Sequence, residues 1–377
     1  MRVAVLKGNG IGPEITQATL RVLEATGIPF EWEDVLVADE AIEKYGHPLP
    51  PESLQQLRSA EIAIKAPLIV ERFKGRVDCP REDGSVATYP SINNAIRREL
   101  GVFVNPRPVK GFPGVSGRHE SLDVVIMREI TEDLYAGLEH IIGDDLAAQA
   151  IKLTTRTAVT KVARFSFEYA RKHGRKRVTC LHKANALSLT DGLFLRCFNE
   201  VSREYGDIVA DDMMIDAACY TIVRDPTRFD VVVTANQYGD IFSDLAAGLA
   251  GSLGLAPGAN IGDNITMVEA CHGAAPDIAG KGVANPLSLI LSSAILLDSV
   301  GYPKEASAIR ESARSVVGAA KDIITPDLRG SGTTESLTTA MVNGLSGDYL
   351  ENKPYSEKKI LCKLQSLSRI MCFRPLT

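Results

Sequence analysis

The chain has 377 residues, of which 45% are hydrophobic and 24% charged, a composition typical of a globular protein rather than a disordered one. Its formal net charge of -5 argues against a general nucleic-acid-binding protein, because such proteins need surplus lysine and arginine to displace phosphate counterions. No uninterrupted apolar stretch approaches twenty residues, so neither a nucleic-acid nor a membrane partner is expected.

The cysteines and the first residues predict a reducing compartment. Seven cysteines are scattered along the chain without a CxxC pair, which indicates neither a zinc site nor a disulfide framework. Met1 leads almost directly into the apolar run at residues 3–6, without the charged and apolar regions of a secretory leader. A cytoplasmic protein is therefore expected.

Strands and helices are predicted to alternate. The chain opens with a strand at residues 3–6, a glycine turn at 8–13 and a helix at 14–23. Further strands are predicted at residues 62–64, 124–127, 178–181 and 230–233, and further helices from about 188, at 244–253, and, as amphipathic segments, at 287–300 and 306–320. This alternation indicates an α/β protein with a doubly wound sheet.

The glycine turn resembles a dinucleotide-binding loop only superficially. Gly8, Gly10 and Gly12 follow the first strand, but the fingerprint needs a glycine at the sixth position, where Pro13 stands. A structural turn is therefore favoured over a cofactor loop.

Three arginines form a candidate anion-binding set. Arg97, Arg107 and Arg128 each offer a planar fork of donors that matches a carboxylate, so together they suit a substrate with several carboxylates. Surface solvation is the alternative. It explains Arg128 poorly, because this residue ends an apolar strand, where ligands of open sheets usually bind.

Acidic residues form a candidate metal site. Asp240 and Asp244 are four residues apart, so a helix beginning near Asp240 would place both on one face, and Asp216 is a third candidate. Oxygen ligands favour Mg²⁺ or Mn²⁺ over zinc. The alternative is that Asp240 only caps the helix.

Lys183, Tyr135 and a small-residue loop complete the candidate set. A lysine after a strand and near a cation can serve as a general base, and a phenol can donate a proton, although most such residues are solvated or packed. The loop at residues 272–280, with Asn285, could approach a flat ligand closely. Asp277 would accept bonds from ribose hydroxyls and repel a 2′-phosphate, which favours NAD over NADP.

Taken in order, these segments resemble the β-decarboxylating dehydrogenases, the family of isocitrate, homoisocitrate and 3-isopropylmalate dehydrogenases. The resemblance spans residues 3 to about 347. It rests on GIGPE at 10–14, the SxN…R…RP stretch, RExTEDxYAGLEH at 128–140, HKAN…TDGLF at 182–194, GDIxSDLAAGLAGSLG at 239–254 and HGAAPDIAGK…ANP at 272–286.

The resemblance implies a role for each candidate. Arg97, Arg107 and Arg128 would hold malate-type carboxylates, Lys183 would take the hydroxyl proton and Tyr135 would protonate the enol carbon. Asp216, Asp240 and Asp244 would bind Mg²⁺ or Mn²⁺. The residues expected to bind NAD are Asn185, His272, Gly273, Ala275, Pro276, Asp277, Ile278 and Asn285.

The resemblance also implies a two-lobed fold that is not a standard Rossmann fold. Residues 1–96 and 245–350 would form the large cofactor-binding lobe, and residues 97–244 the small lobe with the substrate and metal residues. Lys183 and Asp216 would reach the site from the partner subunit, so a homodimer with shared sites is expected. Residues 351–377 form a basic extension that could pack on the body or fray.

The substrate is expected to be a 3-substituted malate. Ser91 and Asn93 would meet its substituent, and hydrogen-bonding side chains would be left unpaired by an isopropyl group. Isocitrate is favoured first, to give 2-oxoglutarate, and homoisocitrate second. 3-Isopropylmalate and a phosphonate analogue (phosphonomethyl-malate), which Lys110 or Arg72 would help neutralise, remain alternatives, as does a non-catalytic regulatory subunit.

Overall fold

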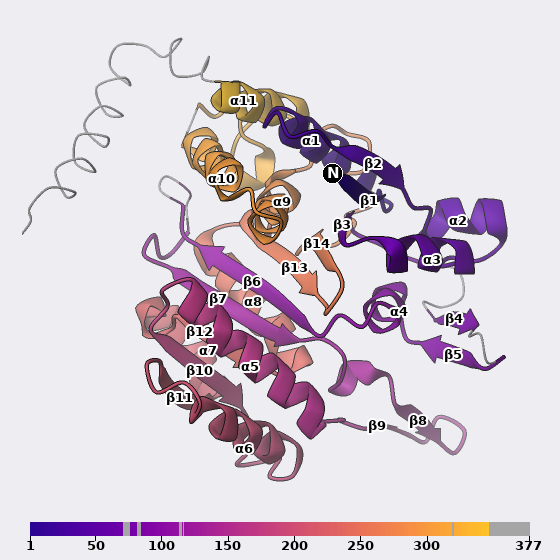
Figure 1. The fold of residues 1–377 in the computed structure, drawn as a ribbon, viewed down its shortest axis with the longest axis vertical. Coiled ribbons are helices and arrows are strands. Elements are labelled where there is room, and N and C mark those ends of the chain that lie inside the picture. Colours follow the sequence, from indigo (N-terminus) through magenta and orange to yellow (C-terminus); the bar gives the residue numbers. More distant parts are fainter. Residues whose placement is uncertain (71–75, 81–83, 113–114, 116, 319, 347–377) are drawn as a thin grey trace, which may run out of the picture.

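One large sheet runs through the whole protein (Figure 1). The computed structural model describes residues 1–70, 76–80, 84–112, 115, 117–318 and 320–346, so Arg72 and the extension at 351–377 lie outside the described residues. The sheet has ten strands in the order β11 (Val209–Met214), β10 (Arg177–His182), β12 (Val231–Thr234), β7 (Asp123–Glu129), β6 (Val104–Lys110), β13 (Pro257–Ile261), β14 (Thr266–Ala270), β3 (Ile62–Lys65), β1 (Arg2–Leu6) and β2 (Glu31–Asp34).

The sheet is parallel at both ends and antiparallel in the middle. β11, β10, β12 and β7 pair in parallel on one side, and β14, β3, β1 and β2 pair in parallel on the other. The pairs β7–β6, β6–β13 and β13–β14 are antiparallel. The predicted mostly parallel α/β sheet is therefore confirmed, with an antiparallel centre that joins its two halves.

Helices cover both faces of the half that contains β7 and β12. The two strands bury consecutive residues on opposite sides, as strand geometry requires. Val125 and Val231 pack with α5 (Arg156–Lys172) and α6 (Thr190–Ser202), whereas Ile126 and Val232 pack with α7 (Ile215–Arg224) and α8 (Asn236–Ala250).

The other half is wound in the same way. Val3 and Ile64 pack on α1 (Gly12–Glu24), α9 (Leu287–Ser299), α10 (Pro303–Val317) and α11 (Thr334–Ser346). Ala4 and Ala63 face α2 (Ala38–Tyr45), α3 (Pro51–Ser59) and α4 (Ile92–Glu99). Both halves are thus doubly wound, as predicted.

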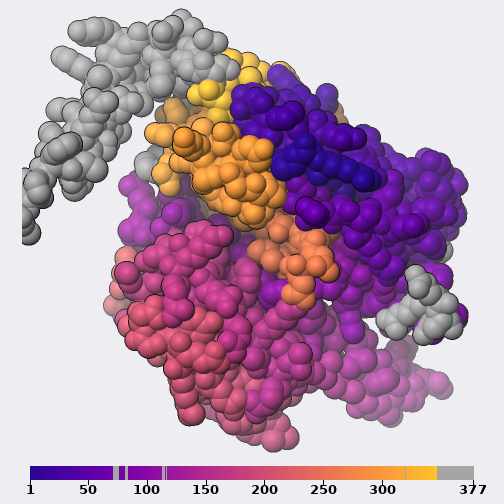
Figure 2. All heavy atoms as spheres, viewed as in Figure 1, coloured from indigo at the N-terminus to yellow at the C-terminus, as the bar shows by residue number. Residues whose placement is uncertain are grey.

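The four apolar clusters follow two parts of the chain. Two of them draw mainly on residues 3–102 and 255–341, and the other two on residues 104–250. Figure 2 shows the same grouping, with the N-terminal and C-terminal parts on one half of the surface and the middle of the chain on the other. Because α8 runs unbroken through residue 244, we propose that the lobes divide near residues 103 and 251 instead of 96 and 244.

Two predicted helices differ from the observed ones. The helix predicted at 244–253 begins eight residues earlier, at Asn236, so Asp240 lies inside α8 and does not cap it. The segment predicted to be amphipathic at 287–300 forms α9, which is buried on nearly all sides because strands and helices surround it. The serines on α9 are tolerated there since Ser288 and Ser292 donate to backbone carbonyls.

The glycine turn at residues 8–13 packs closely against two neighbouring loops. A Cβ atom at Gly8 would lie 2.2 Å from the Pro67 carbonyl oxygen, and one at Gly10 would lie 2.1 Å from the Ala274 carbonyl oxygen. Ile11 N also donates to the Ala274 oxygen at 2.9 Å. Glycine is needed here because the turn touches two neighbouring loops closely.

A short hairpin projects from the body (Figure 1). Its strands β8 (Glu139–Ile142) and β9 (Ala147–Ala150) are exposed along their whole length. A second two-stranded sheet pairs β4 (Val77–Pro80) with β5 (Val86–Tyr89). Among the described helices, none has the length and apolar composition that crossing a lipid bilayer requires.

We predict that Phe167→Ala in α5 strongly destabilises the protein. The ring is fully buried and stacks on Phe198 and Tyr205, with centroid distances of 5.4 and 4.9 Å. Loss of such a ring costs about 3–5 kcal/mol. Denaturant unfolding would measure this, with the exposed Val86→Ala as a control expected to change stability by less than about 0.5 kcal/mol.

Candidate active site

A polar cavity of about 410 Å³ lies where the antiparallel centre of the sheet meets α4 and α8. Four cations and two carboxylates line it, a net positive set. The lining includes the predicted substrate residues together with Lys65, Tyr135, Asp240, Glu269, His272 and Gly273. Residues far apart in the sequence, from 65 to 274, therefore line one cavity.

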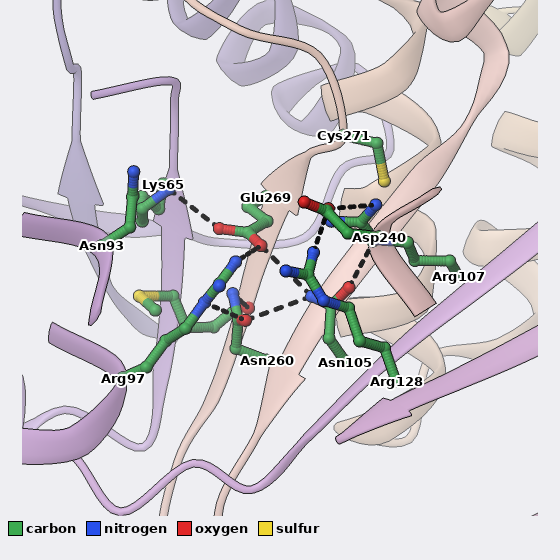
Figure 3. A network of polar contacts seen from close by, with 12 residues as sticks. Lys65, Asn93, Arg97, Asn105, Arg107, Arg128, Asp240, Asn260, Glu269 and Cys271 are labelled. Carbon is green, nitrogen blue, oxygen red and sulfur yellow. Dashed lines mark hydrogen bonds and ion pairs between the residues drawn. The ribbon is translucent and has the colours of Figure 1, made fainter. Parts of the chain in front are cut away.

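Glu269 is the centre of a buried polar network (Figure 3). Its Oε2 accepts from Lys65 Nζ at 2.8 Å, and its Oε1 accepts from Arg97 Nη2 at 2.8 Å. Asn105 Nδ2 donates to the same Oε1 at 3.2 Å and to Asn260 Oδ1 at 3.1 Å. All of these side chains are buried, so each bond forms where water does not compete.

The two cations decide the charge of Glu269. Burial alone raises the pKa of a carboxyl group, but Lys65 and Arg97 more than offset it and hold the pKa of Glu269 well below its usual range. Glu269 is therefore ionised at neutral pH. The Cys271 thiol on the same wall is neutral there, since burial raises its pKa to about 11.

Arg107 and Arg128 extend from neighbouring antiparallel strands toward α8. Arg107 Nε donates to Asn105 Oδ1 at 2.7 Å, and its Nη1 donates to Ser243 Oγ at 2.6 Å. Arg128 Nη2 donates to Asn236 Oδ1 at 2.8 Å, and its Nη1 pairs with Asp240. Burial and the neighbouring arginines lower the pKa of Arg128 to about 9, so it still carries its charge at neutral pH.

Asp240 and Asp244 share one face of α8, as predicted. Arg107 Nη1 lies 3.4 Å from Asp240 Oδ1 and 3.6 Å from Asp244 Oδ1. Burial raises the pKa of Asp244, as does the like charge of Asp240, whereas Arg107 opposes both. A cation placed between these carboxylates would favour their ionised forms.

Tyr135 lies beside this pair, in the 3₁₀ turn η2 (Leu134–Ala136). Its phenol donates to Asp240 Oδ2 at 3.3 Å. Burial and the Asp240 carboxylate raise its pKa, so the phenol keeps its proton at neutral pH. This state suits a proton donor.

Ser91 and Asn93 lie at the N-terminal end of α4 and line the cavity. Ser91 Oγ accepts from Asn94 N at 3.2 Å as the N-cap, which leaves its own hydroxyl proton available. Asn93 Oδ1 is buried and has no hydrogen-bond partner among the described residues. Both predicted residues therefore offer polar groups to a ligand.

Lys183 and Asp216 do not line this cavity. They pair with each other, with Lys183 Nζ 2.7 Å from Asp216 Oδ2, and this bond lowers the pKa of Asp216. Asn185 is exposed in the loop after Lys183 and also lies outside the cavity. Within one chain, the predicted base and the third predicted metal ligand are thus separate from the other site residues.

The backbone around Lys183 is firmly held. Its amide donates to Asp191 Oδ2 at 2.6 Å, and its carbonyl accepts from Leu187 N at 2.8 Å. His182 Nδ1 accepts from Ala184 N at 3.0 Å, which leaves the ring Nε2 proton to bond Asp212 at 3.0 Å. These bonds hold the backbone from which the partly buried side chain of Lys183 extends to Asp216.

The residues present fit an oxygen-preferring cation only in part. Asp240 and Asp244 offer carboxylate oxygens close together. In the described part of the chain, however, no three histidine, cysteine or acidic side chains are close enough to hold a metal ion. Mg²⁺ is usually bound by one or two carboxylates together with water and substrate oxygens, so Asp240 and Asp244 could supply part of such a site.

The predicted cofactor loop forms another wall of the cavity. His272 and Gly273 line it, and burial lowers the pKa of His272, so its imidazole is neutral. His272 Nε2 is buried without a partner among the described residues, and no atom lies within 4 Å of a Cβ built at Gly273. This wall therefore offers an unpartnered imidazole nitrogen and open space to a ligand.

The remaining loop residues lie further along. Ala275 and Ile278 are partly buried, and Pro276 and Asp277 are exposed. Asn285 has a structural role of its own, since it accepts from Leu287 N at 3.0 Å and donates to Asp327 Oδ2 at 2.9 Å.

Lys65 and Glu269 were not predicted from the sequence. Each is a charged residue within an apolar strand, at Ile62–Lys65 and Thr266–Ala270, the same signal that identified Arg128. Lys110 was suggested as a neutralising group, but this is wrong for the cavity: its Nζ lies 3.0 Å from Asp123 and it does not line the cavity.

Comparisons with known proteins agree with this architecture. A model of the isocitrate/isopropylmalate dehydrogenase family matches residues 2–344. The chain is 42% identical over 330 residues to 3-isopropylmalate dehydrogenase of Archaeoglobus fulgidus, covering 88% of this chain and 95% of the relative. It is 40% identical over 339 residues to the mitochondrial NAD isocitrate dehydrogenase catalytic subunit 5 of Arabidopsis thaliana, covering 90% and 87%.

A solved structure shows the same fold. The crystal structure of isocitrate dehydrogenase from Methylococcus capsulatus matches with a TM-score of 0.84 and 40% identity, over 91% of this chain and 99% of that one. The fold and cavity define an α/β enzyme whose cavity is lined mainly by cationic side chains. The chain belongs to the isocitrate/isopropylmalate dehydrogenase family, as its motifs predicted, and is a dehydrogenase that acts by oxidative decarboxylation.

We predict that Glu269→Gln lowers stability by about 3–5 kcal/mol at pH 7, because two buried cations lose their counter-charge. The folded-state pKa of Glu269 is depressed, so its stabilisation is present above the ordinary value of 4.5 and is lost as pH falls through the folded value. The difference from the wild type should therefore shrink below about pH 4.5. Urea unfolding at pH 7 and at lower pH measures both effects.

Glu335→Gln is the matched control for this measurement. Glu335 pairs with Arg21 at 2.6 Å on the surface, so its loss should change stability by less than about 1 kcal/mol. An equal effect of the two substitutions would contradict the central role assigned to Glu269.

Proposed function

We propose that this protein is an NAD- and Mg²⁺- or Mn²⁺-dependent dehydrogenase that oxidises and decarboxylates a 3-substituted malate, with isocitrate, which gives 2-oxoglutarate, as the favoured substrate. The observation that carries the proposal is the buried grouping of Lys65, Arg97, Arg107 and Arg128 around one cavity. Such a set suits a small molecule with several carboxylates.

An acidic substituent is favoured over an isopropyl group. Lys65 adds a fourth cation to the three predicted arginines, and it lines the cavity together with Ser91 and Asn93. The N-terminal end of α4 also faces the cavity and favours negative charge. An apolar substituent would leave the hydroxyl proton of Ser91 without an acceptor.

Each site residue has a role that its surroundings support. Arg97, Arg107 and Arg128 hold the substrate carboxylates. Tyr135, which keeps its proton, donates it to C3 after that carbon loses carbon dioxide. Lys183 of the partner takes the proton of the 2-hydroxyl group.

Asp240 and Asp244, with the partner's Asp216, would hold the cation, and the loop with His272 and Gly273 would hold NAD. When bound, the cation would polarise the oxygen on C2 and the nicotinamide would accept the hydride. Arg107 and Arg128 keep the carboxylates of α8 in place for this arrangement.

A homodimer with shared sites is supported by exposed apolar groups near Lys183 and Asp216. Leu189 is 82% exposed in the loop after Lys183, and Tyr220 is 62% exposed on α7, the helix of Asp216. Leu146, on the projecting hairpin, is 84% exposed. Apolar surface of this kind marks protein contacts, and a two-fold dimer would cover it with the same surface of a second copy.

Two further possibilities remain for experiment. A phosphonate substituent would need cationic groups beyond those that bind a carboxylate, and Lys110 does not supply one. A non-catalytic regulatory subunit is disfavoured, because Tyr135, Lys183 and all three aspartates are present. A cytoplasmic location agrees with the scattered cysteines of the sequence, which form no CxxC pair.

We predict that the purified chain alone reduces NAD with isocitrate and Mg²⁺, faster than with homoisocitrate, 3-isopropylmalate or phosphonomethyl-malate, and faster with NAD than with NADP. EDTA should abolish the reaction, because it would remove the cation that the aspartates hold. Isocitrate turnover that survives EDTA would contradict the metal site.

Lys65→Met should reduce kcat/KM for isocitrate by about 10-fold or more, and for isopropylmalate by much less.

We also predict that two inactive variants complement each other. Lys183→Met and Asp240→Asn homodimers should each lose most activity. A mixed dimer keeps one site with Asp240 from one chain and Lys183 from the other, so an equal mixture after subunit exchange should recover about a quarter of wild-type activity. No recovery despite demonstrated exchange would mean that each site is built from one chain.

A further inference from the structure

The ammonium group of Lys152 lies between two buried carboxylates that are far apart in the sequence. Its Nζ is 2.9 Å from Asp133 Oδ1 and 3.1 Å from Asp191 Oδ1, and 4.3 Å from the centroid of the Tyr238 ring. Both aspartate side chains are 2% exposed and the lysine side chain is 10% exposed. A buried pair of carboxylates depends on such a cation to offset its charge.

The second oxygen of Asp191 binds the backbone of Lys183, the predicted base. Asp191 lies in the first turn of α6, and its Oδ2 accepts from the backbone amide of Lys183 at 2.6 Å. Asp191 therefore fixes the start of the loop from which the Lys183 side chain extends.

The second oxygen of Asp133 binds the first turn of α8, the helix that carries Asp240. Its Oδ2 accepts from Gln237 N at 2.8 Å, in the first turn of the helix that carries Asp240. Asp133 also directly precedes the turn of Tyr135, and it has a φ of 70°, which is unfavourable for a residue other than glycine. Its contacts with Lys152 and α8 therefore stabilise a strained point of the backbone.

We propose that Lys152 is a positioning residue, which bridges Asp133 and Asp191 and thereby fixes the Lys183 loop relative to the Tyr135 turn and α8. This proposal rests on the function proposed above. In a dimer with shared sites, Lys183 serves the partner's site, while Tyr135 and Asp240 serve the site of their own chain. Lys152 therefore links the two sites of the dimer without touching substrate in either.

The expected effect of losing the ammonium follows from charge and geometry. Without it, Asp133 and Asp191 repel each other in a buried place, and the backbone that each one holds shifts. A small misplacement of reacting groups can cost about 100-fold in rate, whereas Arg97, which Asn260 and Glu269 hold, is unaffected.

The first test compares Lys152→Met with Lys152→Arg, assayed with NAD, Mg²⁺ and whichever of the four malates turns over fastest. For Lys152→Met we expect kcat to fall about 10- to 100-fold with KM changed less than about 3-fold. Lys152→Arg should restore most of kcat. Lys152→Gln, which can still donate hydrogen bonds, replaces Lys152→Met if the latter does not fold.

Lys161→Met is the matched control. Lys161 also pairs with a carboxylate, Asp263 at 2.7 Å, and also lies over an aromatic ring, Phe103 at 4.1 Å, but away from the cavity. Its kcat should stay unchanged. If Lys152→Met only lowers the melting temperature, and leaves kcat per folded molecule as in the control, the proposal is overturned.

The second test places Lys152→Met in the mixed dimers. When Lys152→Met is on the Lys183→Met chain, it can affect the intact site of the mixed dimer only through the Tyr135 turn of that chain. When it is on the Asp240→Asn chain, it can affect the intact site only through the Lys183 that this chain supplies. Both mixtures should recover at least 5-fold less activity than the parent mixture. A loss in only one mixture, or in neither, overturns the link. A failure of the parent mixture itself would instead refute the shared dimer, and the first test would still decide the role of Lys152.

Discussion

The carboxylate of Glu269 makes the rest of the site physically possible. Several lysine and arginine side chains packed around one buried cavity would repel each other and would also lose their hydration. Glu269 accepts from Lys65 and Arg97 at 2.8 Å each, and Asp240 pairs with Arg128. These carboxylates offset part of the positive charge and hold each cation in a fixed direction, while the cavity as a whole stays positive.

The antiparallel centre of the sheet explains why these residues meet. β14 carries Glu269, and the neighbouring strands of the centre carry Asn260, Arg107 and Arg128. Each strand contributes a polar side chain, and hydrogen bonds between these side chains hold them in place. This organisation reduces the cost of ordering the site during binding and catalysis.

A second constraint concerns Lys183, the predicted base, and Asp216, the third predicted metal ligand. They pair at 2.7 Å outside the cavity, and Asp191 accepts a hydrogen bond from the backbone amide of Lys183. The proposed dimer would bring this pair to the cavity of the partner. The bridge from Asp191 through Lys152 to Asp133 joins the backbone of Lys183 to the turn of Tyr135.

The sequence by itself determined the family, the α/β class and the three arginines, because these depend on local periodicity and on residue types at fixed spacing. It also placed Asp240 and Asp244 on one helical face, since that follows from the period of the helix. It did not predict Lys65, Glu269 or Lys152. Their partners lie up to 204 residues away, as for the pair of Lys65 and Glu269, so only the tertiary structure could decide which buried charges meet.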